Sequence, residues 1–410
     1  MSGKGENKLE KVLIVGAKRT PIGSFLGSLK KHSASDLGSI ALKAAIEQSG
    51  VSVEQIEEVI LGNALPAGQG QGVARQTSIK AGIPETVPAY GVNMVCGSGL
   101  KSVANAFTAI RAGETDVVAA GGAESMSQAP FLLPQRTREG LKMGNFEVVD
   151  SLVYDGLTDA FHHYHMGVTA ENIAEKYHLS REEQDRFALN SQQKAIQAQK
   201  EGWMQEEIVP VEVKERRETR QMKEDEYPNH STNEEKMAAL RPAFKKEGTV
   251  TAGNASGLND GGSAVIVSSE KFAEENNLTP LAEIISIGQG GVDPAVMGLG
   301  PVPTIEKALK KANLSFNEID VLELNEAFAS QSLGVLRELS EKFDETEEEI
   351  EKKTNPNGGA IALGHPIGPS GNRILVSLIY SLKRQQKTYG LASLCIGGGM
   401  GIAVIIKNIR

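Results

Sequence analysis

Strand-like and helix-like segments alternate twice along the chain, and no other feature of the sequence constrains the fold as much. Residues 11–15 have the pattern of a buried strand, residues 35–50 that of a helix with one apolar face, and residues 59–61 that of a second strand. A helix of small residues at 100–111 and a strand at 116–120 continue the series. This β-α-β order predicts an α/β fold in which helices cover a mostly parallel sheet.

The same order returns near the C-terminus. Residues 264–267 and 320–324 have strand patterns, with a helix near 305–312 between them. Two further strands, at 390–394 and 402–406, flank a run of glycines. We therefore expect a second half that repeats the first.

The stretch between the two halves has a different character. Residues 124–245 are rich in polar and charged side chains, contain the single tryptophan, Trp203, and include a helix opened by the capping pair Ser180 and Glu183. We interpret this stretch as an inserted loop domain.

The length of the chain supports this division, because 410 residues are too many for one ordinary core and suit two similar domains. We expect residues 1–123 and 246–275 to form the N-terminal half, residues 124–245 the inserted domain, and residues 276–410 the C-terminal half. The glutamate-rich run at 343–353 is expected to be a solvated helical connector.

Composition excludes several classes of function. The net charge is -9 and the lysines and arginines are scattered, which argues against a nucleic-acid-binding protein. Residues 1–11 are polar, and no apolar run approaches the roughly 20 residues of a membrane span, so we expect a cytoplasmic protein with no membrane contact. Two cysteines cannot build a disulfide framework, so Cys96 and Cys395 are either buried fillers or reactive thiols in a reducing compartment.

Cys96 stands where a strand ends in a tight turn and the helix of small residues begins. Backbone N–H groups and the positive dipole end at a helix N-terminus stabilise a thiolate, so we expect the Cys96 pKa to lie below its usual value of about 8.5. Gly97 and Gly99 leave room beside the sulfur for a substrate carbonyl. The alternative is a small buried cysteine in a close-packed turn, which the position alone does not exclude.

Two further segments hold a reactive side chain among glycines. His365 lies in the loop 355–368, which has more glycines than packing requires, and a histidine there can take a proton from a thiol or donate a hydrogen bond to a carbonyl oxygen. Cys395 ends a strand, and the glycines from Gly397 onward expose N–H groups suited to an oxyanion. Considered singly, His365 is as well explained by a structural role and Cys395 by a buried filler.

Asn325 also lies where a strand gives way to a helix. Its amide could orient a water or an oxyanion, although a simple helix N-cap explains it equally well. All of these side chains follow the ends of strands, which is where open α/β sheets place their sites. The shared position favours one active site over several separate structural roles.

Four motifs, taken in this order, resemble the pattern of the thiolase family: Cys96-Gly97-Ser98-Gly99, Asn325-Glu326-Ala327-Phe328-Ala329, Gly364-His365-Pro366 and Cys395-Ile396-Gly397-Gly398-Gly399. The likeness spans residues 12–406, and the insertion resembles the short-chain biosynthetic branch at 154–161 and 165–172. The resemblance implies a duplicated thiolase fold, with two β-α-β-α-β-α-β-β halves in a five-layer α-β-α-β-α arrangement and an inserted loop domain.

The resemblance also implies an activity, that of an acetyl-CoA C-acetyltransferase, which condenses two acetyl-CoA molecules to acetoacetyl-CoA and CoA and runs the reverse thiolysis. Cys96 would carry the acetyl group after activation by His365, and Cys395 would remove a proton from the methyl group of the second acetyl-CoA. One oxyanion hole would combine His365 with a water held by Asn325, and the other the N–H groups of Cys96 and Gly397. No metal or organic cofactor is expected, because a thioester acidifies its own α-hydrogen and carries its own leaving group.

In this family the insertion folds over CoA, which places six residues of this chain along the CoA channel: Leu157, His165, Met166, Ala252, Ser256 and Gly257. Many relatives carry an arginine near the nucleotide phosphates where this chain has Asn229, and Lys223 or His230 could supply the missing contact. The resemblance further implies a homotetramer, a dimer of dimers with part of the insertion at the tetramer contact.

Other functions stay open at this point. A degradative 3-ketoacyl-CoA thiolase of broad chain length would share every catalytic residue, although bulk from Met166 and residues 154–161 near the acyl end argues against it. A non-catalytic protein that binds acyl-CoA or lipid would not need both cysteines, the histidine and the asparagine. A metal site is not expected, because no cysteine or carboxylate stands at ligand spacing from the neighbouring histidines His162, His163 and His165.

Overall fold

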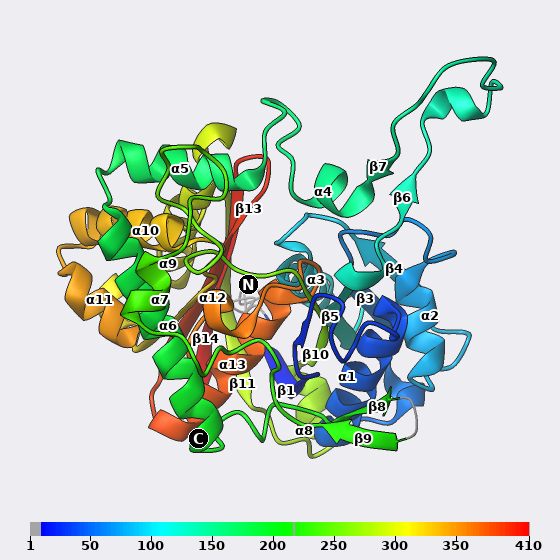
Figure 1. Ribbon diagram of the computed structural model, residues 1–410. Coiled ribbons are helices and arrows are strands. Elements are labelled where there is room, and N and C mark those ends of the chain that lie inside the picture. The colour runs from blue at the N-terminus through cyan, green and yellow to red at the C-terminus, as the bar shows by residue number, and fades with distance from the viewer. Residues whose placement is uncertain (1–9, 216–217, 410) are drawn as a thin grey trace, which may run out of the picture.

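The computed structural model describes residues 10–215 and 218–409, and most of its strands belong to two similar groups (Figure 1). The N-terminal group contains β1 (Val12–Arg19), β2 (Gly23–Ser24), β3 (Glu58–Gly62), β4 (Ala89–Val92), β5 (Val117–Ser125) and β10 (Asn259–Ser269). The C-terminal group contains β11 (Ala282–Gly291), β12 (Val321–Leu324), β13 (Tyr389–Ile396) and β14 (Met400–Asn408). Within the described residues they join in the order β12-β13-β14-β11-β1-β10-β5-β3-β4, with β2 beside β10.

Helices cover both groups and also lie between them. α1 (Ala34–Ser49) and α2 (Val73–Lys80) pack on the N-terminal group, and α9 (Pro301–Ala312) and α10 (Ala329–Phe343) pack on the C-terminal group. α3 (Ser98–Ala112) and α13 (Ser370–Gln385) pack on each other and on both groups of strands, around a large apolar core. The layers are therefore α-β-α-β-α, as the family resemblance implies.

The two groups repeat one topology. With short helices left aside, the chain order in the first half is β1-α1-β3-α2-β4-α3-β5-β10. In the second half it is β11-α9-β12-α10, then one isolated β-bridge, then α13-β13-β14. That bridge, a parallel pair between Leu322 and Thr354, takes the place beside β12 that β4 takes beside β3. The spatial order of the strands is also the same, so the predicted duplication is confirmed.

The prediction of a mostly parallel sheet is wrong. Parallel pairing joins β3 to β4, β3 to β5 and β12 to β13, whereas β1–β10, β1–β11, β5–β10, β11–β14 and β13–β14 are antiparallel. In each half the last strand enters between two earlier strands and runs against both, β10 between β1 and β5 and β14 between β11 and β13. Gly398 and Gly399, with φ of 86° and 83°, form the tight turn that reverses the chain between β13 and β14.

The residues between β5 and β10 form short strands and helices of differing length: β6 (Phe131–Leu132), β7 (Val149–Asp150), α4 (Ser151–Gly156), α5 (Met166–Lys176), α6 (Arg181–Lys200), β8 (Val211–Glu215), β9 (Glu218–Met222) and α7 (Glu234–Ala238). Ser180 caps α6 and Glu183 returns the hydrogen bond, as the sequence predicts. The segment that begins with β6 and ends with β7 projects from the body of the molecule, and we call residues 131–150 the arm (Figure 1).

The remaining helices are α8 (Glu270–Glu275), α11 (Glu347–Lys353) and α12 (Ala360–Leu363), with 3₁₀ turns at Val53–Gln55, Met126–Gln128, Gln135–Thr137, Pro294–Leu299 and Phe316–Glu318. α11 covers most of the glutamate-rich run, and Ile350 is its one buried residue, which agrees with the predicted solvated helical connector. Among the helices of the described residues, none has both the length and the apolar character needed to cross a membrane.

Candidate active site

A strained turn presents Cys96 at the start of α3. Val95 has a φ of 45°, in the left-handed region that β-branched residues avoid, and strain of this kind is characteristic of functional turns. The turn is closed by a hydrogen bond from the Gly97 N–H to the Met94 carbonyl (2.9 Å) and one from the Ser98 hydroxyl to the Val95 carbonyl (2.6 Å). The chain around Cys96 is therefore held in a conformation that costs energy.

The expectation of a low Cys96 pKa is wrong for this structure. The sulfur accepts hydrogen bonds from the N–H groups of Cys96 and Gly397, and these donors lower the pKa. Burial has the larger effect and raises the Cys96 pKa to about 11, with a further contribution from the nearby Glu124 carboxylate. Cys96 therefore rests as a thiol and needs a base in order to act as a nucleophile.

His365 has the protonation pattern of such a base. Its Nδ1 lies 2.6 Å from the Ser370 hydroxyl oxygen, and that hydroxyl donates its own proton to the Pro366 carbonyl (2.6 Å). The Ser370 oxygen can therefore only accept from His365, which puts the imidazole proton on Nδ1 and leaves a lone pair on Nε2. Burial, together with the positive charge of Arg373, lowers the His365 pKa to about 4, so the ring is neutral.

Asn325 and Cys395 lie on neighbouring strand ends. The Asn325 N–H donates to the Ser393 carbonyl of β13 (3.1 Å), two residues before Cys395, and both side chains are 1% exposed. Burial raises the pKa of Cys395, so this thiol too is protonated at rest. Cys395 packs in an apolar cluster with Met166, Phe328 and others.

Some buried polar atoms at this place have no partner. Within the described residues, neither the amide oxygen nor the amide nitrogen of Asn325 has a hydrogen-bond partner, and the same holds for His365 Nε2. Buried polar groups are almost always satisfied, so unpaired atoms indicate a ligand or water position. These are the two side chains that the family resemblance assigns to one oxyanion hole.

Packing brings the separate loops together. A Cβ placed on Gly97 would lie 2.4 Å from Ile396 Cδ1, so the Cys96 turn packs directly against the end of β13. Ile367, two residues after His365, shares an apolar cluster with Cys96 and Leu157. The structure thus packs the end of β13 and the loop of His365 against the Cys96 turn.

The insertion residues expected along the channel lie beside this centre. The Met166 N–H donates to the Leu157 carbonyl (2.8 Å), and Leu157 packs in the cluster of Cys96. Met166 Sδ lies 3.6 Å from the position of a Cβ on Gly397. His165 caps α5 and stacks on Phe244, with ring centroids 4.7 Å apart.

The other three expected channel residues contact other segments of the chain. The Ser256 N–H donates to the Ala327 carbonyl (2.9 Å), and a Cβ on Gly257 would lie 2.4 Å from the Tyr227 ring. Ala252 lines a cavity of about 400 Å³ together with Tyr227, Asn229 and Lys236. Lys236, rather than Lys223 or His230, is the basic residue that this cavity contains.

Sequence reasoning missed Phe244, Ser370 and Lys236. Phe244 lies in a polar stretch with no periodic pattern, and Lys236 is one of 43 basic residues, so neither gives a local signal. Ser370 did have a local signal, because it stands at the start of a helix five residues after the candidate catalytic histidine His365.

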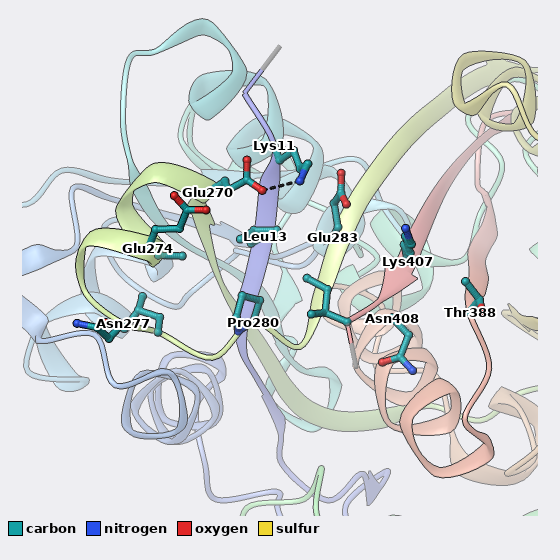
Figure 2. Close-up of a pocket in the computed structure, with 13 residues that line it drawn as sticks. Lys11, Leu13, Glu270, Glu274, Asn277, Pro280, Glu283, Thr388, Lys407 and Asn408 are labelled. Atoms are coloured by element: carbon teal, nitrogen blue, oxygen red, sulfur yellow. Dashed lines mark hydrogen bonds and ion pairs between the residues drawn. The ribbon is translucent and has the colours of Figure 1, made fainter. Parts of the chain in front are cut away.

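Of the three neighbouring histidines, His162 bonds Asp159 (2.9 Å) and stacks on Tyr164, and His165 stacks on Phe244. A second, larger cavity of about 970 Å³ lies at the seam where β1 meets β11 (Figure 2). Its lining includes Lys11, Glu270 and Lys407 but neither cysteine, so we place the active site around Cys96.

Two family models together match almost the whole chain. Residues 12–271 match the family model of the thiolase N-terminal domain and residues 278–408 that of the thiolase C-terminal domain. A probable acetyl-CoA acyltransferase of Staphylococcus aureus (strain COL) is 52% identical over 403 residues, which cover 98% of this chain and 100% of the relative.

Two solved structures are similar over almost the whole chain. Acetyl-CoA acetyltransferase from Syntrophomonas wolfei has a TM-score of 0.95 and 44% identity, covering 98% of this chain and 100% of that one. Human mitochondrial 3-ketoacyl-CoA thiolase in complex with CoA has a TM-score of 0.91 and 45% identity, covering 98% of each chain. The chain belongs to the thiolase family.

Proposed function

We propose that this protein is an acyltransferase of acetyl-CoA, and specifically an acetyl-CoA C-acetyltransferase that condenses two acetyl-CoA molecules to acetoacetyl-CoA and CoA. The observation that carries the proposal is that the buried His365 Nε2 and the Asn325 amide have no hydrogen-bond partner among the described residues. Their loops pack beside Cys96 and beside the strand that carries Cys395. The relative from Staphylococcus aureus, named a probable acetyl-CoA acyltransferase, supports the same reaction class.

In the first half-reaction, His365 Nε2 takes the proton of Cys96 and the thiolate attacks the acetyl-CoA carbonyl. The N–H groups of Cys96 and Gly397, which already point at the sulfur, stabilise the oxyanion of the tetrahedral intermediate. The C–S bond to CoA then breaks, Cys395 donates its proton to the CoA sulfur, and CoA leaves. The products are acetyl-Cys96, a protonated His365 and a Cys395 thiolate.

In the second half-reaction, the Cys395 thiolate removes a proton from the methyl group of a second acetyl-CoA. Protonated His365 and a water held by the Asn325 amide donate hydrogen bonds to the enolate oxygen. The carbanion attacks the acetyl-Cys96 carbonyl, a C–C bond forms, and the Cys96 thiolate leaves and recovers its proton from His365. Every proton and bond balances, and no metal or organic cofactor is required.

The acyl end of the channel supports a short substrate. Leu157 packs in the apolar cluster of Cys96 and Met166 lies next to Gly397, where their bulk would restrict the acyl group. The second candidate is a 3-ketoacyl-CoA thiolase of broad chain length, which the similarity to human mitochondrial 3-ketoacyl-CoA thiolase supports.

We also assign the 400 Å³ cavity to the nucleotide part of CoA. Ala252, an expected channel residue, lines this cavity, and so does Lys236, which could pair with a phosphate. Lys236 would then replace the arginine that many relatives carry at the position of Asn229. The lysine side chain already donates to the Ser231 carbonyl (2.6 Å), which holds it at this cavity.

The test is CoA-dependent thiolysis of acetoacetyl-CoA, compared between the wild type, Cys96→Ala and a control on the same helix, Thr108→Ala. We expect activity in the wild type and the control, and none with Cys96→Ala. The same assay with 3-ketohexadecanoyl-CoA separates the two candidates. Comparable rates with both substrates would overturn the acetyl-specific assignment, and unchanged thiolysis by Cys96→Ala would overturn the mechanism.

A further inference from the structure

The two halves correspond to each other residue by residue where their strands end. In the first half Gly62 of β3 pairs with Gly122 of β5, and in the second half Leu324 of β12 pairs with Ser393 of β13. One residue beyond Gly62 stands Asn63, and one beyond Leu324 stands Asn325. Two residues beyond Gly122 stands Glu124, and two beyond Ser393 stands Cys395. Glu124 therefore occupies in the first half the position of Cys395 in the second.

The central helices correspond in the same way. α3 begins with Ser98-Gly99 and α13 with Ser370-Gly371, and each serine donates back to a carbonyl of the preceding turn (2.6 Å in both). Two residues before these serines stand Cys96 and Gly368. A Cβ on Gly99 would lie 2.8 Å from the Gly368 carbonyl oxygen, so the two helix starts are in direct contact.

Each strand end faces the helix start of the other half. Cys395 of the second half lies so close to Cys96 of the first half that Cys96 contributes to raising the pKa of Cys395. Glu124 of the first half accepts a hydrogen bond from the Gly368 N–H of the second (2.9 Å). The Cys395–Cys96 contact thus has a counterpart in the hydrogen bond between the Glu124 carboxylate and Gly368, in the loop of His365.

Glu124 is completely buried and serves as an acceptor for four donors. Oε1 accepts from Asn63 Nδ2 (2.7 Å) and the Leu65 N–H (3.2 Å), and Oε2 accepts from the N–H groups of Ala64 and Gly368 (2.9 Å each). Asn63 Nδ2 donates to this carboxylate, whereas neither side-chain polar atom of its counterpart Asn325 has a hydrogen-bond partner within the described residues. Burial raises the Glu124 pKa to about 7, but four donors and no acceptor fit the carboxylate form.

Hydrogen bonds continue from Glu124 to the Cys96 turn. The Ala64 carbonyl accepts from Asn93 Nδ2 (3.2 Å), and the Asn93 side-chain oxygen accepts from the Val95 N–H (3.0 Å). On the other side, Gly368 has no room for a side chain, since a Cβ there would lie 2.8 Å from Glu124 Oε2 and from the Ala123 carbonyl oxygen. Glu124 therefore connects the loop of the proposed base to the turn of the proposed nucleophile.

We propose that Glu124 is a positioning residue, whose carboxylate fixes the loop 365–368 against the Cys96 turn and so sets the approach of His365 to the sulfur. The expected effect of Glu124 on kcat rests on the proposed function, whereas its expected effect on the rigidity of the loop 365–368 does not. The Glu124–Gly368 contact joins the two halves of the duplicated fold, and we call it the clamp. It corresponds by position to the contact between Cys395 and Cys96, but it is a structural hydrogen bond instead of a pair of thiols.

The test uses Glu124→Gln, which keeps the side-chain volume but turns an NH₂ group toward backbone N–H donors. We expect kcat for acetoacetyl-CoA thiolysis to fall about tenfold to a hundredfold while KM changes less than about twofold, since the CoA contacts are untouched. Hydrogen exchange of a peptide covering residues 364–369 should accelerate. Glu124→Asp, which keeps the charge, should recover part of both effects and serves as the second variant if Glu124→Gln does not fold.

The matched control is Glu171→Gln, a buried carboxylate that accepts N–H bonds from Thr249 and Val250. It should lose stability without faster exchange at 364–369. Exchange is measured without substrate, so the clamp is tested even if the wild type shows no thiolysis. Wild-type kcat in Glu124→Gln, a loss through KM alone, or unchanged exchange at 364–369 would each overturn the proposal.

Discussion

The Ser370 hydroxyl lies 2.6 Å from His365 Nδ1 while its own proton is bound to the Pro366 carbonyl, so one serine determines both the tautomer and the orientation of the ring. The free Nε2 lone pair follows from this arrangement, and it is the atom that a neutral base needs beside a thiol of raised pKa.

Replacing this serine should reduce catalysis more than binding. In Ser370→Ala the Nδ1 proton has no acceptor and the ring is free to turn, so we expect kcat to fall about tenfold or more with KM nearly unchanged. Steady-state thiolysis measures both constants. Ser377→Ala, which removes another buried hydroxyl of α13, is the control and should keep wild-type kcat; an equal loss in both variants would mean that Ser370 acts on stability alone.

The titration of Cys96 should be displaced to high pH. Its pKa is raised to about 11, so the thiolate fraction, and with it the rate of alkylation by iodoacetamide, should increase about tenfold per pH unit through the neutral range. The neutral base is retained until His365 is protonated near pH 4, so thiolysis should fall only on the acid side of about pH 5. An alkylation midpoint between pH 6 and 8 would restore the low-pKa thiol expected from the sequence.

Much of the fold was accessible from the sequence because its determinants are local. The extent of α1 and the capping pair of α6 are set by neighbouring residues. Both bounds of α1 lie within one residue of the prediction, and Ser180 and Glu183 cap α6 as predicted. The direction of β10 is not local: β10 pairs antiparallel with β1 and β5 across an insertion of more than a hundred residues. No window of sequence contains that information.

The same limit applies to the site. Glycines and strand ends indicated Cys96, His365, Cys395 and Asn325 as candidates, but the Cys96 pKa depends on burial by residues from several distant segments. The helix-terminus argument considered only the favourable N–H groups and omitted the loss of water, which is the larger effect here. Lys236 could not be chosen over Lys223 or His230 without knowing which of them lines the cavity.

A buried ion cluster attaches the insertion to β1, and its loss should be costly. Arg19 is fully buried and bonds Glu207 (2.7 Å) and, through two nitrogens, Asp225 (2.7 and 2.9 Å). Arg19→Met would leave two buried carboxylates unpaired, so we expect a loss of about 3–5 kcal/mol in urea denaturation. Lys342→Met, which breaks an exposed pair with Glu306, should cost less than about 1 kcal/mol.

Lys236 should matter only for substrates that carry the nucleotide. Removing its charge in Lys236→Ala is expected to raise KM for CoA about tenfold, the value of one charged hydrogen bond, with kcat retained. Acetoacetyl-pantetheine, which lacks the nucleotide, should be turned over by the variant as by the wild type. Lys223→Ala is the control, and an increase of KM in that variant rather than in Lys236→Ala would refute the assignment of the cavity.

The arm is the part of the insertion best suited to the expected tetramer contact. Met143 is 99% exposed and Phe131 68% exposed, on a segment that projects from the body (Figure 1). Apolar side chains exposed on such a projection favour contact with another copy. Met143→Asp combined with Phe131→Asp would bury unpaired charge in that contact, so light scattering after gel filtration should show a tetramer for the wild type and a dimer for the variant. Ser231→Asp, an exposed position outside the arm, is the control for added charge, and a variant that stays tetrameric would place the contact elsewhere.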